Sequence, residues 1–410
     1  MKNTSPPSIT STHFHFRPRA AGLLAALALL GLSPPARAQD SLGDRVRQLE
    51  REVELEQIEV TARRLNEDAI RLGPITVTGY VEGSYTRNLG NPDQRQDANR
   101  FRLSDPDHDA FAVTAAKLGL SRRVSGLNEF DAGFRFELAA GRIVREVYED
   151  QTFSFVDQSL SIAQAYAELQ LPTWRAPLQV RLGRMHSWFG VESLDLYKNP
   201  SFSLSPLALA VPKTVTGLSA SLELGAGLRY SQFLVQGWDR VEDLNDAKTL
   251  GGQLAFDASG LSLALNYVVG AERPDSDSDL RWAVELAARW QVTASTELRA
   301  SFLYGQEEFD DGTAKFGGAS VTVSQGLLEV EGEGFHRLTA SLRGSYLRDQ
   351  GGTRTGVDQA LGEVTATLAL NFLKDASLRL EYRHDFSSDD EAFDGDDDQS
   401  TLALALHYAF

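Results

Sequence analysis

The last ten residues of the chain alternate strictly between large apolar side chains and small or polar ones. On an extended strand, one face would carry Leu402, Leu404, Leu406, Tyr408 and Phe410, and the other Thr401, Ala403, Ala405, His407 and Ala409. A period of two over about ten residues is typical of a strand that crosses a bilayer as part of a closed barrel. We therefore expect the apolar face to contact lipid and the other face to point inward.

The same period of two recurs along the chain from residue 74 onward. It predicts about 16 strands, an even number as single-chain barrels require, with 14 as the alternative if the segments 318–330 and 335–348 are misread. The predicted fold is all-β, a single antiparallel outer-membrane β-barrel over residues 71–410. The expected strands are 75–87, 110–121, 129–141, 159–171, 177–187, 214–224, 227–238, 248–257, 261–271, 280–291, 294–306, 318–330, 335–348, 360–372, 377–387 and 399–410.

Long and short connections alternate between these strands, which is typical of longer outer loops and short periplasmic turns. Most carboxylate clusters fall in the long connections, which supports this sidedness and places the C-terminus in the periplasm. The carboxylates of Asp394, Asp396 and Asp398 are candidate ligands for weak binding of Ca²⁺ or Mg²⁺, although their spacing is not that of an EF-hand. The expected long connections are 88–109, 142–158, 188–213, 272–279, 307–317 and 388–398.

The first 38 residues have the pattern of a secretory signal peptide. Arg17 and Arg19 precede the apolar run 20–32, and Ala36-Arg37-Ala38 is a small-x-small cleavage site, so the mature chain is expected to begin at Gln39. The alternative is an uncleaved anchor. The apolar run is shorter than the 18 or more residues that a membrane-spanning helix needs, so the sequence predicts no helical span.

Residues 39–70 switch to a heptad pattern, with Leu42, Val46, Leu49, Val53 and Val60 at the a and d positions. This pattern predicts a short periplasmic coiled coil, marginal as a single helix but stable if copies of the chain associate. Together with the strand number, it favours a homotrimer. The alternatives are a solvated amphipathic helix or a frayed tether.

Charged residues occupy the inward positions of many predicted strands, in numbers that would be costly in lipid or in a dry core. They either form a fully paired plug or line water, and about 16 strands enclose too wide a space for side chains to fill, which favours an aqueous channel. Further inward charges are Glu223, Glu297, Arg337 and Glu363. The residues expected to line the pore are Arg135, Glu137, Arg181, Arg281, Glu285, Arg289, Arg299, Arg343, Arg379, Glu381 and Arg383.

The connection 187–213, after the fifth strand, is more apolar than the other long loops. Such a loop is expected to fold into the barrel, narrow the pore and set its charge selectivity by a local field, with its charges opposite Arg181 and Arg184. The alternative is a cap over the mouth or a contact with a neighbouring subunit. The residues expected to form the constriction are Arg184, Trp188, Glu192, Asp195, Tyr197 and Lys198.

Composition excludes several classes of partner and chemistry. The net charge of −17 and the pI near 4.9 argue against nucleic acid, because phosphate binding needs a basic surface. The chain has no cysteine, which removes thiol catalysis, disulfides and cysteine-based metal sites. The mean hydropathy of −0.26 is compatible with a barrel, since only half of each strand faces lipid. We expect no cofactor.

Several short motifs resemble the OmpL-like β-barrel porin family, most clearly before about residue 240. These are Gly79-Tyr80-Val81-Glu82-Gly83-Ser84-Tyr85, Gln164-Ala165-Tyr166, Leu182-Gly183-Arg184, Phe189-Gly190-Val191-Glu192, Asn199-Pro200-Ser201-Phe202-Ser203 and Thr216-Gly217-Leu218. The resemblance implies passive passage of ions and small hydrophilic solutes. A weaker similarity to phosphate-selective porins does not extend to their selectivity, because the inward arginines are interleaved with carboxylates and no lysine-rich loop is found.

The favoured function is therefore a diffusion channel of the outer membrane, with a weak cation preference expected from the acidic outer loops. The alternatives are an envelope-tethering or adhesive barrel without an open pore and, least favoured, an outer-membrane hydrolase, because the histidines are scattered and no Gly-x-Ser-x-Gly lies near them. The expected partners are outer-membrane lipid and lipopolysaccharide. We also expect the barrel assembly machinery as a partner, because a terminal strand that ends on an aromatic residue resembles the assembly signal of outer-membrane barrels.

Overall fold

The computed structural model describes residues 70–410, with gaps at 149–159, 244, 275, 311, 331–336 and 374. The chain divides into two compact units, 1–67 and 68–410, and the described residues belong to the second. The signal peptide expected at 1–38 and all but the last residue of the expected coiled-coil segment 39–70 lie outside the described residues. No helix in the described part is long and apolar enough to cross a membrane.

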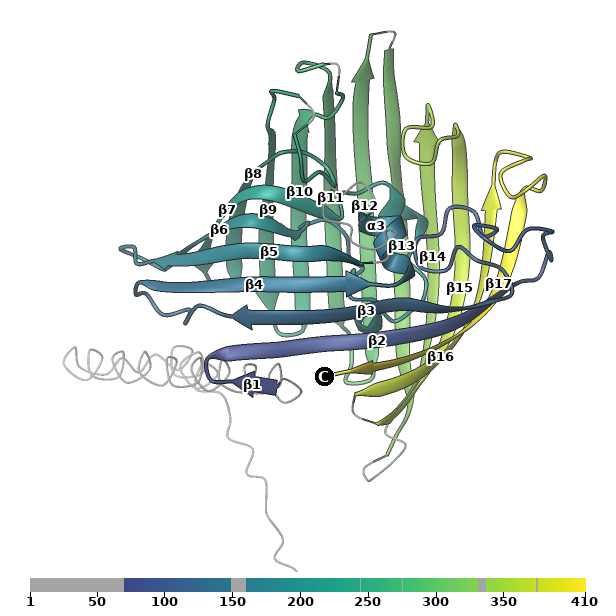
Figure 1. Ribbon diagram of the computed structural model, residues 1–410, viewed down its shortest axis with the longest axis horizontal. Helices are drawn as coiled ribbons and strands as arrows, with labels where there is room; N and C mark the ends of the chain where they lie inside the picture. Colours follow the sequence, from purple (N-terminus) through teal and green to yellow (C-terminus); the bar gives the residue numbers. More distant parts are fainter. Residues whose placement is uncertain are drawn as a thin grey trace, which may run out of the picture. The chain divides into compact units, whose positions relative to one another are not determined.

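Sixteen antiparallel strands close into a single barrel, β2 to β17, in which each strand pairs with its neighbours in sequence (Figure 1). The ring closes where β17 pairs with β2, from Thr401 opposite Asn88 to Ala409 opposite Tyr80. The prediction of about 16 strands is therefore confirmed. The strands are β2 (Ile75–Asn88), β3 (Ala110–Arg122), β4 (Asp131–Ala140), β5 (Leu160–Leu171), β6 (Leu178–His186), β7 (Thr214–Gly225), β8 (Leu228–Val235), β9 (Thr249–Ala258), β10 (Leu261–Ala271), β11 (Leu280–Gln291), β12 (Thr296–Phe309), β13 (Gly312–Glu329), β14 (Arg337–Gln350), β15 (Gln359–Leu373), β16 (Ala376–Ser387) and β17 (Asp398–Ala409).

A short additional strand, β1 (Ile70–Leu72), pairs with Ile75–Val77 at the start of β2. It occupies the edge of β2 beyond the point where the pairing with β17 ends at Tyr80. The backbone groups at the start of β2 are therefore paired, as a bilayer requires of any strand that it contacts.

The alternation of side chains decides which face of each strand is outside. In β17, Leu402, Leu404 and Leu406 are 42 to 50% exposed, whereas Thr401 and Ala403 are at most 4% exposed. The apolar faces of the other strands are exposed in the same way, which gives the barrel an apolar outer surface suited to lipid. The inward faces carry the polar and charged residues.

Two connections differ from the sequence prediction. The prediction of a long loop at 307–317 is wrong, because β12 and β13 continue as a paired hairpin to Phe309, which lies opposite Gly312. Charged residues such as Glu307 and Lys315 interrupt the alternation of apolar side chains in this region. The backbone pairing of the two strands nevertheless continues through it. The connection expected at 142–158 begins with a helix, α3 (Arg142–Tyr148), which is too short to produce a helical period in the sequence.

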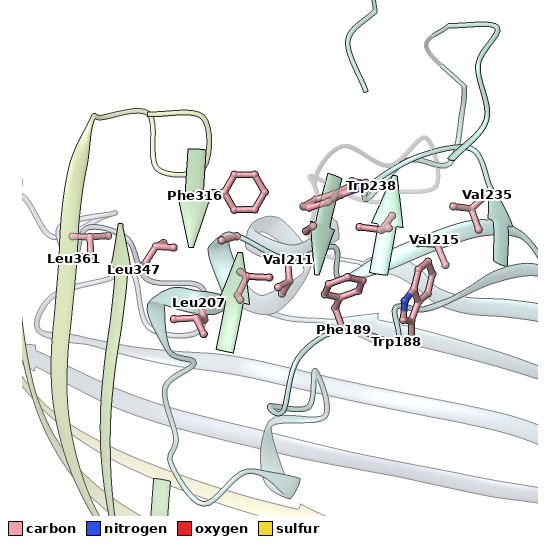
Figure 2. Packing of buried hydrophobic residues seen from close by; sticks show 14 of the residues in the cluster. Trp188, Phe189, Leu207, Val211, Val215, Val235, Trp238, Phe316, Leu347 and Leu361 are labelled. Atoms are coloured by element: carbon pink, nitrogen blue, oxygen red, sulfur yellow. The ribbon is translucent and has the colours of Figure 1, made fainter. Parts of the chain in front are cut away.

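The barrel interior is filled around α3 and the connection between β6 and β7. The side chains of Ile143, Val144 and Tyr148 on α3 are completely buried, in a cluster that includes Tyr80 and Leu196. A second cluster joins the same β6–β7 connection to inward side chains of the opposite strands, as Figure 2 shows for Leu207 and Val211 near Phe316, Leu347 and Leu361.

Candidate functional site

The connection between β6 and β7, residues 187–213, lies inside the barrel and is called the inner loop below. It contains two short 3₁₀ helices, η1 (Leu196–Lys198) and η2 (Pro206–Leu209). Leu196 and Phe202 are completely buried, which explains why this loop is richer in apolar residues than the others. The sequence expectation that it folds inward agrees with this placement.

The first turn of the inner loop is fixed by aromatic packing. The ring of Trp188 stacks on that of Phe233 on β8, with centroids 3.8 Å apart and planes 10° from parallel. On β9, a Cβ atom at Gly251 would lie 1.9 Å from the Trp188 ring, so only glycine leaves room for it. The indole Nε1 donates a hydrogen bond to the carbonyl oxygen of Tyr267. This end of the loop therefore packs tightly against β8–β10.

Arg343, on β14, is the main anchor on the opposite wall. Its guanidinium is completely buried and donates to Glu192 of the inner loop over 2.7 Å and to Glu363 on β15 over 2.6 Å. It also donates to the carbonyl oxygen of Ser203 over 2.6 Å. One arginine thus holds two separate points of the loop, in a buried network whose charges are paired.

Strand β16, separated from β14 by β15, holds the loop with three successive inward residues. Arg379 donates to the carbonyl oxygens of Leu196 and Tyr197, and Arg383 donates to that of Leu204 over 2.6 Å. Between them, the carboxylate of Glu381 accepts the backbone N–H groups of Phe202 and Ser203 over 2.6 and 3.0 Å. The exposed fractions of these three side chains are only 1 to 2%, so the loop covers them from water.

The other side of the inner loop is held by Lys117 on β3. Its ammonium group lies 3.1 Å from the carboxylate of Asp195, which also pairs with Lys198 over 2.6 Å. Burial opposes ionisation of Asp195, but the two ammonium groups outweigh it and hold the pKa of Asp195 below its ordinary value. Asp195 therefore stays charged, and its contact with Lys117 persists, at all but strongly acidic pH.

A third wall contributes Glu285 on β11. Its carboxylate accepts the backbone N–H of Gly190 over 2.8 Å and the hydroxyl of Ser301 over 2.6 Å, and it also accepts the amide of Asn266. The inner loop is thus tied to β3, β11, β14 and β16, and crosses the interior rather than following one wall.

A second connection, residues 89–109, also reaches inside, although its sequence predicts only a long loop. Arg102 is 4% exposed and donates to Asp385 on β16 over 2.6 Å, to Asp105 over 2.8 Å and to Thr401 on β17 over 3.0 Å. The only signal in the sequence was an arginine within an acidic loop, which by itself does not separate an inward residue from a solvated one.

The structure places the remaining expected pore residues on inward faces with nearby partners. Arg135 pairs with Glu137, Arg281 with Glu307, and Arg181 with Glu168 over 2.7 Å. The loop acids meet Arg343 and Lys117 instead of the expected Arg181 and Arg184, and the Arg184 guanidinium lies over the Tyr148 ring at 5.4 Å. Near the short-turn end, Arg289 and Arg299 share the carboxylate of Glu297.

In the acidic connections, the described residues form no assembled metal centre. Within the described ranges, no three His, Asp or Glu side chains are grouped so that they could hold an ion, and Asp394, Asp396 and Asp398 are no exception. These three aspartates are exposed, and Asp394 accepts a hydrogen bond from Gln94 of the 89–109 connection.

Two cavities lie along the inward faces of β11–β13, one above the other. The first, of about 190 Å³, is bounded by the inner loop and by Glu285, Ser301 and Ser320. The second, of about 320 Å³, is bounded by Tyr197 and Lys198 of the loop and lies toward the short turns. They belong to the same strands, because Ser301 of the first and Arg299 of the second are successive inward residues of β12.

Comparison with known proteins addresses the barrel as a whole. A family model described as "Putative beta-barrel porin-2, OmpL-like" matches residues 74–410. No curated protein matches the chain.

Among solved structures, OmpF of Salmonella typhi in complex with daunomycin has a TM-score of 0.56 at 14% identity, covering 82% of this chain and 97% of its own. The outer-membrane channel DcaP of Acinetobacter baumannii has a TM-score of 0.55 at 15% identity, with the same coverages. An anion-selective porin from Comamonas acidovorans has a TM-score of 0.54 at 14% identity, covering 82% of this chain and 99% of its own. At these identities the likeness is one of fold.

Proposed function

Because the chain belongs to the OmpL-like family of β-barrel porins, we propose that it provides a water-filled path for the passive diffusion of ions and small hydrophilic solutes across the outer membrane. A porin-like channel follows from the family and the fold, and porins of this kind are normally not enzymes. The observation that carries the proposal is the inner loop, held across the interior of a closed 16-stranded barrel by buried ion pairs on several walls.

The inner loop is proposed as the constriction of this path. A 16-stranded barrel encloses an interior too wide for the side chains of its wall to fill. A loop fixed across this interior therefore determines the width of the channel. The two cavities beside β11–β13 support a path along that wall. Of the charged residues predicted from the sequence to line the path, Glu285, Arg289 and Arg299 adjoin the cavities. Arg343, Glu381 and Arg383 are instead covered by the inner loop and serve as its anchors.

The sidedness of the barrel is likewise proposed. We assign the short turns and the C-terminus to the periplasm and the acidic long connections to the outside, with residues 1–38 as the export signal. Exposed carboxylates of the outer connections would then favour cations weakly at the entrance, by raising their local concentration.

Planar-bilayer recording tests the proposed channel. We expect the purified, folded barrel to insert and to give discrete conductance steps, with a weak cation preference in a salt gradient. Insertion without any steps would contradict the porin function and would favour an envelope-tethering barrel. The conductance of an unfolded preparation is the control for leaks in the bilayer.

The proposed homotrimer rests on the heptads of residues 39–70 and is tested by deletion. Removing residues 40–66 is expected to convert a trimer into monomers, because the marginal helices are stable only when they associate. The mass of the detergent-solubilised protein, measured by light scattering, decides this. A trimer that survives the deletion would show that the barrel surface, and not the heptad segment, drives association.

A further inference from the structure

The cavity of about 320 Å³ at the short-turn end has an unusual charge balance. Among the described residues that line it, five are basic, namely Lys198, Arg289, Arg299, Arg337 and Arg379, and one, Glu297, is a carboxylate. This contrasts with the chain as a whole, which carries a net charge of −17. We call this cavity the basic vestibule.

The carboxylates near the basic vestibule do not neutralise it. Glu297 is shared between Arg289 and Arg299, each of whose Nε atoms donates to it over 2.7 Å, so this group keeps an excess positive charge. Asp195 is likewise shared, between Lys198 and Lys117. Arg379 donates to backbone carbonyl oxygens, which satisfy its N–H groups without cancelling its charge, and its nearest carboxylate, Glu82, is 3.8 Å away.

Arg337 is the least satisfied of the five. Its Nε atom is buried and has no hydrogen-bond partner, and it forms no ion pair with any carboxylate of the described residues. Arg289 and Lys198, in contrast, have side chains that are 58 and 50% exposed, so both can reach a solute inside the vestibule. The site thus combines accessible cations with an arginine that forms no ion pair among the described residues.

The neutral part of the lining also donates hydrogen bonds. Hydroxyl groups of Ser324, Ser341 and Ser377 face the vestibule, and the Ser377 hydroxyl is buried without a partner. Arginine and hydroxyl donors together suit an oxyanion with several oxygen atoms, because planar guanidinium groups bind carboxylate and phosphate oxygens in pairs.

We propose that the basic vestibule is a binding site for small multivalent oxyanions, carboxylates or phosphates, at the periplasmic end of the channel. The proposal rests on the proposed channel function for its role in transport, but binding itself requires only the folded barrel. It assigns the path two regions of opposite sign, an acidic outer entrance and a basic inner one. An anion that passes the inner loop would be held at the vestibule before release.

Calorimetric titration of the folded, full-length protein in detergent tests the site, with citrate, inorganic phosphate and glucose as probes. We expect citrate and phosphate to bind and glucose not to bind, and the stronger of the two anions identifies the preferred chemistry. In the double variant Arg289→Gln/Arg337→Gln, the dissociation constant is expected to rise roughly tenfold or more, because two charge-assisted donors are lost. Arg123→Gln, an exposed arginine outside the vestibule, is the matched control and should leave binding unchanged.

Absence of anion binding to the wild-type protein, or equal binding by the double variant, would overturn the proposal. If the double variant does not fold, Lys198→Gln replaces it, since Asp195 keeps its contact with Lys117. In bilayers, citrate should block the current from one side far more than from the other. Steps without such a block would refute the vestibule alone, whereas anion binding without steps would refute the channel alone.

Discussion

We expect Arg343→Ala to lower the free energy of unfolding of the barrel by about 3–5 kcal/mol, the usual cost of breaking a buried ion pair by removing one partner. The substitution leaves Glu363, which is 1% exposed, and Glu192 without the guanidinium that separates them. It also frees the carbonyl oxygen of Ser203. The midpoint and slope of urea unfolding, followed by tryptophan fluorescence in detergent, measure this change.

Arg348→Ala is the matched control for this experiment. Arg348 lies five residues further along β14 and also forms an ion pair, with Asp358 over 2.5 Å, but both side chains are about half exposed. Because solvent screens such a pair, its loss is expected to leave unfolding nearly unchanged. Equal destabilisation by the two substitutions would mean that the buried position of Arg343 does not matter, which would contradict its role as the anchor of the inner loop.

The second large effect is expected on conductance. Replacing residues 194–204 by four Gly and Ser residues removes the part of the inner loop that crosses from Lys117 to β14 and β16. The single-channel conductance is then expected to rise several-fold, since water and ions would fill the space that the loop occupies and the barrel wall would set the width. The exposed guanidinium groups of Arg343, Arg379 and Arg383 should also shift the reversal potential toward anions.

The control for the loop replacement alters a connection outside the lumen. Four glycines inserted into the turn between Phe309 and Gly312 lengthen the β12–β13 hairpin without touching the inner loop. This variant should conduct like the wild-type protein. If the loop replacement folds, as judged by heat-dependent electrophoretic mobility, and conducts no better than the control, the inner loop is not the constriction.

The strands could be predicted from the sequence because lipid imposes the same alternation on every one of them. Leu404 and Ala403 are assigned to opposite faces by that rule alone, and their exposures agree. The rule fails where lipid no longer contacts the strand, as in β13, whose first residues, 312–317, extend beyond the apolar band. It gives no information about α3, whose burial depends on contacts that exist only once the barrel has closed.

The site was predictable only in part for a related reason. Alternation places Arg343 and Arg383 inside, but it cannot tell whether an inward charge meets water or a partner. The partners of these two arginines in the loop, Glu192 and Leu204, are separated from them by 151 and 179 residues. Such pairings depend on the position of the loop in the folded barrel, and no local sequence pattern predicts that position.

The same separations set an order of events during assembly. The inner loop leaves the wall after β6, yet its anchors on β14 and β16 belong to a later part of the chain. Contacts between such distant residues form late, because the intervening chain must be ordered first. The contacts of the inner loop with Lys117 on β3 and Phe233 on β8 do not need the last strands, whereas its anchors on β14 and β16 do. The loop is therefore fixed on all of its walls only when β14 and β16 have joined the barrel.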